Sequence, residues 1–139
     1  MINNKSTVFD CSTITLPKNH QINGHLTAVS NGVEMPFDVK RIYYLYDIPS
    51  SSKRGGHSHK KLQQILIAIS GSFDVVLKDG KTETTITLNK PFEGLLITNE
   101  IWRELKNFSS GAVCLVIASD VFSEEDYIRE LDDFLATKF

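Results

Sequence analysis

Short hydrophobic runs recur along the chain, separated by residues that favour turns. The segment 63–88 holds three such runs with breaks at 70–72 and 78–81, and the pair Asp79-Gly80 in the second break favours a tight hairpin turn. Further runs rich in β-branched and aromatic residues span 39–48, 94–98 and 111–119. Many short strands with closely spaced turns are typical of all-β folds, and we interpret this chain as a single jelly-roll barrel.

Only the C-terminal segment has helical periodicity. Ser123 is a suitable N-cap with Asp126 three residues later, and the segment 123–135 is acidic in its first turn. Its apolar residues recur at helical spacing: Tyr127, Ile128, Leu131, Phe134 and Leu135. We predict a short C-terminal α-helix over 123–135 that packs against the barrel or a partner subunit.

Composition limits the class of protein. The chain has 139 residues, 41% of them hydrophobic, with no internal repeat or linker, so we expect one domain spanning 1–139. A net charge of −2 argues against nucleic-acid or membrane binding. No apolar run approaches the roughly 20 residues of a membrane helix, and no hydrophobic signal region opens the chain, so we expect a soluble cytoplasmic protein. Of the two cysteines, Cys11 fits no pattern and Cys114 lies in an apolar run that predicts burial.

The stretch "RGGHSHKKLQQ" at 54–64 contains two histidines one residue apart. On a strand, His57 and His59 would point to the same side. Four residues separate His59 from Gln64 and six separate Gln64 from Gly71, a spacing that resembles the first motif of the cupins. In metal-binding cupins the two histidines and a glutamate at the Gln64 position are metal ligands.

A second cupin motif supplies the third histidine, and its best match here is "TNEIWRELKN" at 98–107. It keeps Asn107 but has Arg103 at the histidine position. Gln64 is a weak ligand and Arg103 a permanent cation, so we do not expect a tightly bound metal. Three uses of the histidine pair stay open: acid–base chemistry, which we favour because an unperturbed pKa of roughly 6.5 suits it; exposed polar surface; and a metal site.

Basic residues gather between positions 40 and 61. Six lie there against the single acid Asp47: Lys40, Arg41, Lys53, Arg54, Lys60 and Lys61. Arg41 alternates onto the face of Tyr43, and Arg54 precedes two glycines that let a ligand approach the backbone. Because an arginine fork can bind two oxygens, we predict an anionic ligand such as a diphosphate, although a solvated basic loop would give the same pattern.

Four stretches together resemble the sugar 3,4-ketoisomerases over about residues 22 to 136: "PFDVKRIYYLYDIP", "RGGHSHKKLQQ", "GSFDVVLKDG" and "ASDVFSEEDYIRELDDF". These are metal-independent cupins that act on dTDP-4-keto-6-deoxyglucose in the synthesis of amino sugars for bacterial surface glycans. The resemblance implies a cupin barrel, that substrate, no cofactor and a homodimer. Asn23 stands where members typically carry arginine, a difference that bears on a substrate contact and not on the fold.

The resemblance and the residue chemistry together give candidate roles. Moving a carbonyl from C4 to C3 needs a base, a proton relay and stabilisation of an enediolate. His57 and His59 are candidates for base and shuttle, in either order, and Tyr43 could orient the sugar, relay a proton or pack in the core. The candidate substrate-binding residues are Arg41, Arg54, Lys60, Gln64, Arg103 and Asn107.

The sequence leaves open the roles of Arg103 and Trp102, and it leaves open two function classes besides the isomerase. Arg103 could reach a sugar oxygen or form a salt bridge with Glu100 or Glu104, and Trp102 could be core or a stacking platform for thymine. Besides the isomerase, the chain could be a non-catalytic cupin that binds a nucleotide sugar or carbohydrate. A metal-dependent cupin such as a dioxygenase is the third class, and Gln64 with Arg103 argues against it.

Overall fold

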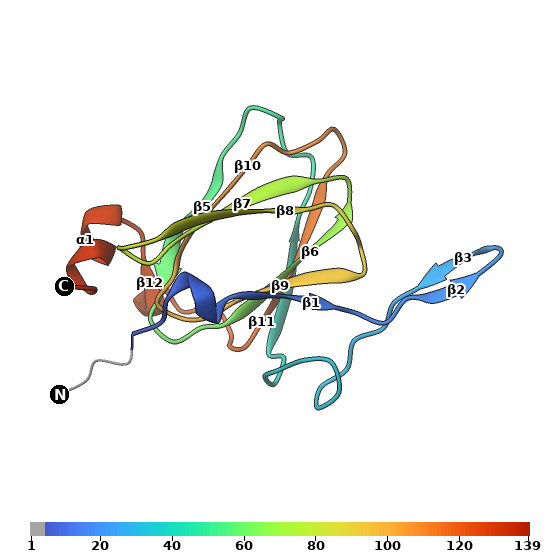
Figure 1. The fold of residues 1–139 in the computed structure, drawn as a ribbon, viewed down its shortest axis with the longest axis horizontal. Coiled ribbons are helices and arrows are strands. Elements are labelled where there is room, and N and C mark those ends of the chain that lie inside the picture. Colours follow the sequence, from blue (N-terminus) through green and yellow to red (C-terminus); the bar gives the residue numbers. More distant parts are fainter. Residues whose placement is uncertain (1–4) are drawn as a thin grey trace.

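Two five-stranded antiparallel sheets form the body of the chain in the computed structural model, which describes residues 5–139 (Figure 1). The first sheet has the order β1 (Ser12–Thr15), β9 (Glu93–Ile97), β6 (Gln64–Ser70), β11 (Val113–Ala118) and β4 (Arg41–Leu45). The second has the order β12 (Tyr127–Ile128), β5 (Arg54–His59), β10 (Trp102–Lys106), β7 (Phe73–Lys78) and β8 (Glu83–Leu88). The all-β class predicted from the sequence is confirmed.

Three further features lie outside the two sheets. Strands β2 (Asn19–Gln21) and β3 (Gly24–Leu26) form a hairpin that projects from the body (Figure 1). One-turn 3₁₀ helices span Val8–Asp10 and Glu124–Asp126, and the α-helix α1 spans Leu131–Ala136. Within residues 5–139, no helix combines the length and apolarity that crossing a membrane would require.

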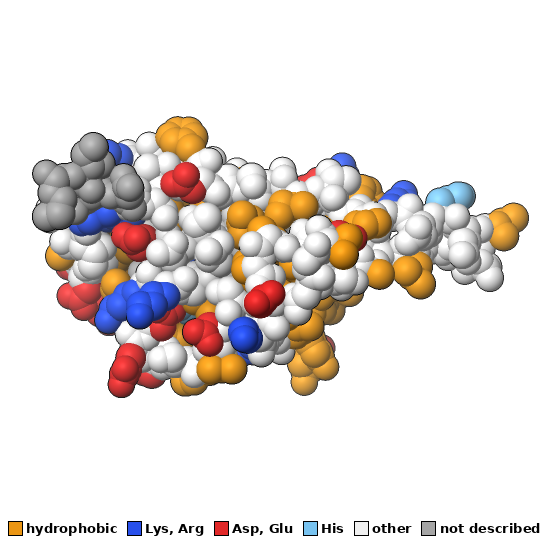
Figure 2. Space-filling view, turned by 90° about the horizontal axis from the view of Figure 1, so that it is seen from below, with side chains coloured by type: hydrophobic (Ala, Val, Ile, Leu, Met, Phe, Trp, Pro, Cys, Tyr) orange, Lys and Arg blue, Asp and Glu red, His pale blue; other side chains and the backbone are white. Residues whose placement is uncertain are grey.

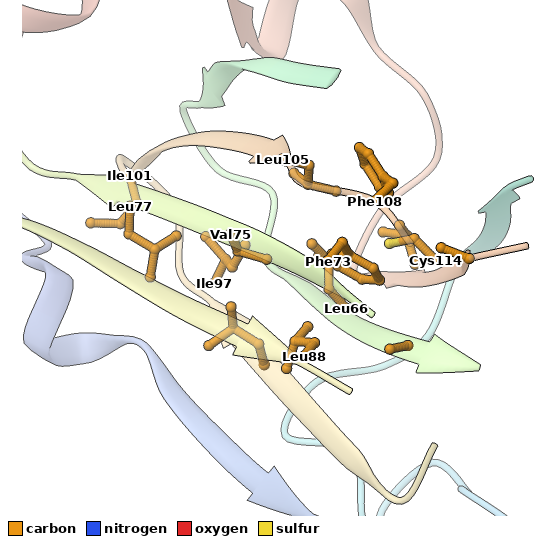
Figure 3. Close-up of a cluster of buried hydrophobic side chains, with 14 of the residues drawn as sticks. Leu66, Phe73, Val75, Leu77, Leu88, Ile97, Ile101, Leu105, Phe108 and Cys114 are labelled. Carbon is orange, nitrogen blue, oxygen red and sulfur yellow. The ribbon is translucent and has the colours of Figure 1, made fainter. Parts of the chain in front are cut away.

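The hydrophobic core lies between the sheets. Leu66 and Val116 enter it from the first sheet, and Val75 and Leu77 enter it from the second, where both are fully buried (Figure 3). Cys114 belongs to the same cluster and is fully buried, as predicted, and burial raises the pKa of its thiol to about 12. Two sheets that share one apolar core hold the strands rigidly enough to fix polar groups at one end.

The predicted turn at Asp79-Gly80 is confirmed, with β7 ending before it and β8 beginning after it. Gly80 has a φ of +94°, which favours glycine over other residues. The Asp79 carboxylate accepts hydrogen bonds from the backbone of Lys81 at 2.9 Å and Thr82 at 2.7 Å. It also accepts one from the backbone of Val8 at 2.9 Å, so the turn ties the N-terminal segment to the second sheet.

The predicted helix over 123–135 is wrong for its first half. Residues 124–126 form a single 3₁₀ turn, Tyr127–Ile128 pair with β5 as strand β12, and α1 begins only at Leu131. Pairing with an exposed strand edge satisfies backbone groups that a helix would have satisfied internally, and this tertiary contact overrides the local periodicity. Phe134 of α1 is fully buried, with its ring 5.8 Å from that of Trp102, so the helix packs against its own subunit.

Candidate active site

Strand β5 carries both histidines to the inner side of the second sheet. The strand pairing shifts between Arg103 and Leu105 of β10, so that His57 faces Arg103 while Arg54 faces Leu105. Gly55 lies in this irregular stretch with a φ of +76°, and a Cβ there would come within 2.9 Å of a Leu105 methyl group. Only glycine fits this bend without strain, and the bend sets the direction in which His57 points.

A cavity of about 510 Å³ opens in front of His57. Its lining consists of Arg41, Tyr43, Leu45, Lys53, Arg54, Gly55, His57, Tyr127 and Arg129. Four of these side chains are cations, so the cavity attracts an anionic ligand. Arg129 is paired with Glu124 through bonds of 2.6 and 2.7 Å, whereas Lys53 and Arg54 form no ion pair with any residue of 5–139.

Three aromatic rings meet at the inner end of the cavity. The His57 and His59 ring centroids are 4.8 Å apart, and the Tyr127 ring lies 5.0 Å from His57 and 4.4 Å from His59. His57 is partly exposed to the cavity, whereas His59 lies behind it with 1% of its surface exposed. The Nε2 atoms of both rings are buried without a hydrogen-bond partner among the described residues. The structure therefore places only His57 where a ligand can reach it directly.

Both imidazoles are neutral at physiological pH. Burial lowers the pKa of His57 to about 3, and the nearby positive charge of Arg103 acts in the same direction. Burial and then Arg103 lower the pKa of His59 to about 2. A neutral imidazole has one nitrogen with a free lone pair, which is the form that a proton acceptor requires.

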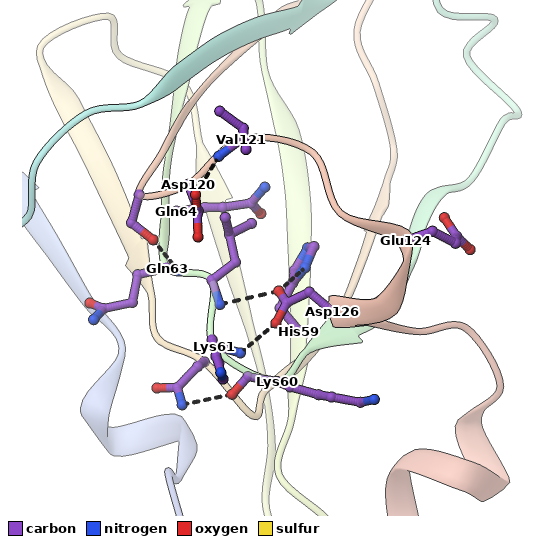
Figure 4. Close-up of polar contacts among 12 residues, drawn as sticks. His59, Lys60, Lys61, Gln63, Gln64, Asp120, Val121, Glu124 and Asp126 are labelled. Carbon is purple, nitrogen blue, oxygen red and sulfur yellow. Dashed lines mark hydrogen bonds and ion pairs between the residues drawn. The ribbon is translucent and has the colours of Figure 1, made fainter.

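His59 is held from the side by Asp126 (Figure 4). Its Nδ1 lies 3.2 Å from Oδ2 of Asp126. The same carboxylate accepts hydrogen bonds from the backbone N–H of Lys61 at 2.8 Å and of Leu62 at 3.2 Å. Asp126 thus joins the C-terminal segment to the end of β5.

A chain of hydrogen bonds connects Tyr43 to Arg103. Gln64 donates through Nε2 to the Tyr43 hydroxyl at 3.1 Å, and its Oε1 accepts a bond of 2.7 Å from Nη1 of Arg103. Arg103 is 1% exposed, and its other donors bond the carbonyl of Ile101 at 3.3 and 3.1 Å. Burial lowers the pKa of Arg103 to about 10, so it remains a cation at neutral pH, and burial raises the pKa of Tyr43. Gln64 and Arg103 lie behind the cavity wall and not on it.

The salt bridge considered for Arg103 is not formed with Glu100 or Glu104. Glu104 instead accepts a hydrogen bond of 2.8 Å from the indole of Trp102 and lies 3.7 Å from the Lys78 ammonium. Trp102 is 4% exposed and packs against α1, so it belongs to the core and does not provide a stacking surface.

Besides Gln64 and Arg103, two further candidate binding residues do not line the cavity. Asn107 follows the end of β10, is exposed, and donates a 2.8 Å bond to Asp74. It has a φ of +55°, a conformation that asparagine tolerates, which gives it a role in the turn. Lys60 is exposed and lines a separate hollow together with Asp126. A substrate contact by either residue does not fit this placement within the subunit.

The sequence pattern missed four cavity or neighbouring residues: Lys53, Asp126, Tyr127 and Arg129. Lys53 was visible in the basic stretch but not singled out. Residues 127 and 129 share one face only if the segment is extended, and the helical interpretation concealed that alternation. Asp126 contacts residues more than 60 positions away, and no local pattern indicates this contact.

No group of three or more His, Cys, Asp or Glu side chains in residues 5–139 is arranged to hold a metal ion. Gln64 and Arg103, the two residues that align with cupin ligand positions in the sequence, bond to each other. A guanidinium opposite His57 repels a divalent cation, so the donor set here does not suit a metal.

Comparisons with known proteins identify the family to which the chain belongs. The family model described as "FdtA: WxcM-like, C-terminal" matches residues 9–138. The TDP-4-oxo-6-deoxy-alpha-D-glucose-3,4-oxoisomerase of Aneurinibacillus thermoaerophilus is 43% identical over 111 residues, which is 80% of each chain.

Two solved structures are also similar. The 3,4-ketoisomerase QdtA of Thermoanaerobacterium thermosaccharolyticum, in a mutant form bound to TDP-4-keto-6-deoxyglucose, has 38% identity and a TM-score of 0.92, with 94% of each chain covered. The TDP-quinovose 3,4-ketoisomerase WlaRB of Campylobacter jejuni has 46% identity and a TM-score of 0.87, with 91% of this chain and 98% of that chain covered. The chain described here belongs to the FdtA-like family of sugar 3,4-ketoisomerases.

Proposed function

We propose that the chain is an isomerase that moves the keto group of a TDP-linked 4-keto-6-deoxyhexose from C4 to C3. The observation that carries the proposal is the position of His57, a neutral imidazole at the inner end of a cavity rimmed by Arg41, Lys53, Arg54 and Arg129. Membership of the 3,4-ketoisomerase family supports the same reaction. QdtA, at 38% identity, is described in complex with TDP-4-keto-6-deoxyglucose, which supports that substrate class.

His57 is the base in this proposal because it alone of the two histidines lines the cavity. It removes the proton from C3, and the electron pair forms the C3–C4 double bond of an enediolate, whose C4 oxygen then takes up a proton to give the enediol. Return of a proton to C4 and loss of the proton on the C3 oxygen complete the isomerisation. Protons and electrons balance, so the reaction needs no redox cofactor.

Tyr43 is the candidate that relays the proton between the two oxygens. Its hydroxyl accepts the 3.1 Å bond from Gln64 and so keeps its own proton available toward the cavity. Gln64 and Arg103 act through Tyr43 in this account, since neither lines the cavity. The positive charge of Arg103 would also stabilise an enediolate that forms beside His57.

The diphosphate is assigned to the cationic rim. Arg54 has no acidic partner among the described residues, and Arg41 stacks 4.6 Å from the Tyr43 ring, which fixes its guanidinium at the cavity. An arginine without an acidic partner breaks no ion pair when phosphate oxygens replace its bound water, and it can bind two of these oxygens at once. Metal independence is part of the same proposal, supported by the Gln64–Arg103 pair at the former ligand positions.

We further propose that residues 1–139 form one cupin jelly-roll domain that acts as a homodimer. The projecting β2–β3 hairpin exposes Ile22 and 57% of Leu26, and hydrophobic side chains also gather on the adjoining face of the body (Figure 2). Asn23 lies at the turn of this hairpin. Covering such apolar surface in a second copy is the usual solution for a soluble oligomer. Light scattering at micromolar concentration should give a dimer mass, and Ile22→Asp should shift it toward monomer.

Incubation of the protein with TDP-4-keto-6-deoxyglucose in deuterated water tests the activity. NMR should show the 3-keto isomer together with deuterium at C3 or C4, because the abstracted proton exchanges with solvent. A non-catalytic sugar-binding protein would shift substrate resonances without isomer or exchange. That result would replace the isomerase with the binding function.

A further inference from the structure

We propose that Asp126 is a positioning residue that holds His59 as the Nδ1–H tautomer, so that the lone pair of its Nε2 faces the interior of the site. This inference rests on the proposed isomerase function and deepens it. It also gives a role in the site to the 3₁₀ turn Glu124–Asp126, whose last residue lies 67 positions beyond His59 in the chain.

The Asp126 carboxylate is fixed before it meets His59. Its Oδ1 accepts the 2.8 Å bond from the Lys61 backbone, and its Oδ2 accepts the 3.2 Å bond from the Leu62 backbone. The backbone carbonyl of Asp126 accepts a further 2.9 Å bond from Lys60. Three backbone bonds therefore hold Asp126 against the end of β5 and leave Oδ2 aimed at the imidazole.

The contact with His59 defines a tautomer. An ionised carboxylate only accepts hydrogen bonds, so the 3.2 Å approach of Nδ1 requires a proton on Nδ1. A neutral ring with its proton on Nδ1 carries its lone pair on Nε2. That Nε2 is buried and has no hydrogen-bond partner among residues 5–139, so nothing in the protein competes for its lone pair.

The ring orientation is fixed as well as the tautomer. Tyr127 stands directly opposite His59 in the β5–β12 pairing, and the two rings pack at 4.4 Å. The His57 ring contacts the other side at 4.8 Å in an edge-on arrangement. His59 is thus a buried acceptor behind the histidine that meets the substrate, with Asp126 preventing rotation of its ring.

A purely structural role is the competing explanation, because Asp126 also satisfies the turn at Lys60–Leu62. The two explanations differ in what they predict for His59. A structural cap places no requirement on the His59 tautomer or on turnover at saturating substrate. A positioning residue controls both.

Asp126→Asn separates the two explanations. Asparagine has one acceptor oxygen for three donors, so its amide N–H₂ must face either the Lys61 backbone N–H or the Leu62 backbone N–H together with His59. The Lys61 bond, at 2.8 Å against 3.2 Å for Leu62, favours keeping the oxygen at the Oδ1 position. The N–H₂ then points at Nδ1 of His59, which can accept from it by moving its own proton to Nε2, so the variant should favour the Nε2–H tautomer. Glu125→Gln is the matched control, since Glu125 is the neighbouring acid, is exposed and forms no ion pair within residues 5–139.

The experiment combines ¹⁵N NMR of labelled histidine with kinetics on the same samples. Wild type and Glu125→Gln should show His59 as Nδ1–H, and Asp126→Asn should shift it to Nε2–H. In the same variant kcat should fall about 10- to 100-fold while the affinity for TDP changes less than about threefold. The wild-type spectrum needs no variant, so the test survives if Asp126→Asn fails to fold.

The outcomes distinguish this inference from the proposed function. Absence of isomer from wild type would overturn the proposed function. Two results would overturn the role of Asp126 alone. One is an Nε2–H tautomer of His59 in wild type. The other is a kcat of Asp126→Asn within about threefold of that of an active wild type.

Discussion

Arg103 donates a 2.7 Å hydrogen bond from Nη1 to Oε1 of Gln64. These two residues occupy the positions at which metal-binding cupins have a histidine and a glutamate as ligands. The bond joins the side chains that would otherwise bracket an ion, and both are buried, with 1% of Arg103 and 2% of Gln64 exposed. Gln64 in turn supports Tyr43 by donating a hydrogen bond of 3.1 Å to its hydroxyl.

Introducing both cupin ligands should create a metal site. The double substitution Gln64→Glu with Arg103→His places a carboxylate and a third imidazole beside His57 and His59, a donor set that suits a divalent transition metal. Isothermal titration with Zn²⁺ should detect binding at the site in the double variant. Gln64→Glu alone should bind none there, because Arg103 would pair with the new carboxylate. Equal zinc binding by the wild-type site would contradict the argument from lost ligands.

Tyr43→Phe should lower kcat about 10- to 100-fold if the hydroxyl relays a proton. The variant also leaves Nε2 of Gln64 without its acceptor, at a cost of about 1–3 kcal/mol in unfolding free energy. Tyr44→Phe is the control, since Tyr44 is the next residue of β4 and is exposed on the opposite face. Circular dichroism and steady-state kinetics measure both effects. Unchanged kcat in Tyr43→Phe would assign Tyr43 to packing.

Arg54→Ala should weaken binding more than it slows chemistry. Loss of a two-point phosphate contact should raise Kd for TDP about tenfold or more, while kcat at saturation changes little, because the reacting carbons lie at His57. Lys90→Ala removes an exposed cation that does not line the cavity and should change neither quantity. Equal losses in both variants would indicate a general effect of charge and no specific contact.

The unfolding free energy should fall as the pH is lowered, and His59 should contribute to this fall. The pKa of this ring falls from 6.5 to about 2 on folding, mainly because of burial. Between these values the unfolded chain binds a proton that the folded protein does not, so His59 lowers the unfolding free energy by up to about 1.4 kcal/mol per pH unit as pH falls below 6.5.

Urea titrations at several pH values measure this linkage. His59→Asn should flatten the dependence between pH 6.5 and about 4 relative to wild type. Above pH 7 the difference in unfolding free energy between the two proteins should be constant, since His59 is then neutral in both the folded and the unfolded state. A parallel dependence of wild type and His59→Asn would show that His59 titrates normally in the folded state.

Local patterns in the sequence predicted the strands and the placement of the two histidines on one face of a strand. The turn at Asp79-Gly80 follows from backbone conformation, and the shared face of His57 and His59 follows from the two-residue period of a strand. Long-range pairing could not be predicted in the same way. Asp126 was assigned to a helix, whereas the structure uses its carboxylate to bind residues at the end of β5.

The position of Asn107 shows a related limit. Its place in a motif indicated a ligand contact, but the chain turns after β10 and the side chain bonds Asp74 instead. Motif spacing gives the order of residues along a strand, whereas a turn at the end of the strand decides where the last of them points. Arg103, inside the same strand, is directed inward as the motif suggested.

We expect His57 to take the proton from C3 without a metal. The most direct measurement is the rate of deuterium incorporation into TDP-4-keto-6-deoxyglucose, followed by NMR, with protein stripped by chelator and verified as metal-free by elemental analysis. We expect stripped wild type to exchange and isomerise at its untreated rate. We expect the exchange rate of His57→Asn to fall roughly 100-fold or more, while the variant binds TDP within about tenfold of wild type. Near wild-type exchange in His57→Asn, or activity that disappears with chelator and returns with metal, would contradict this mechanism.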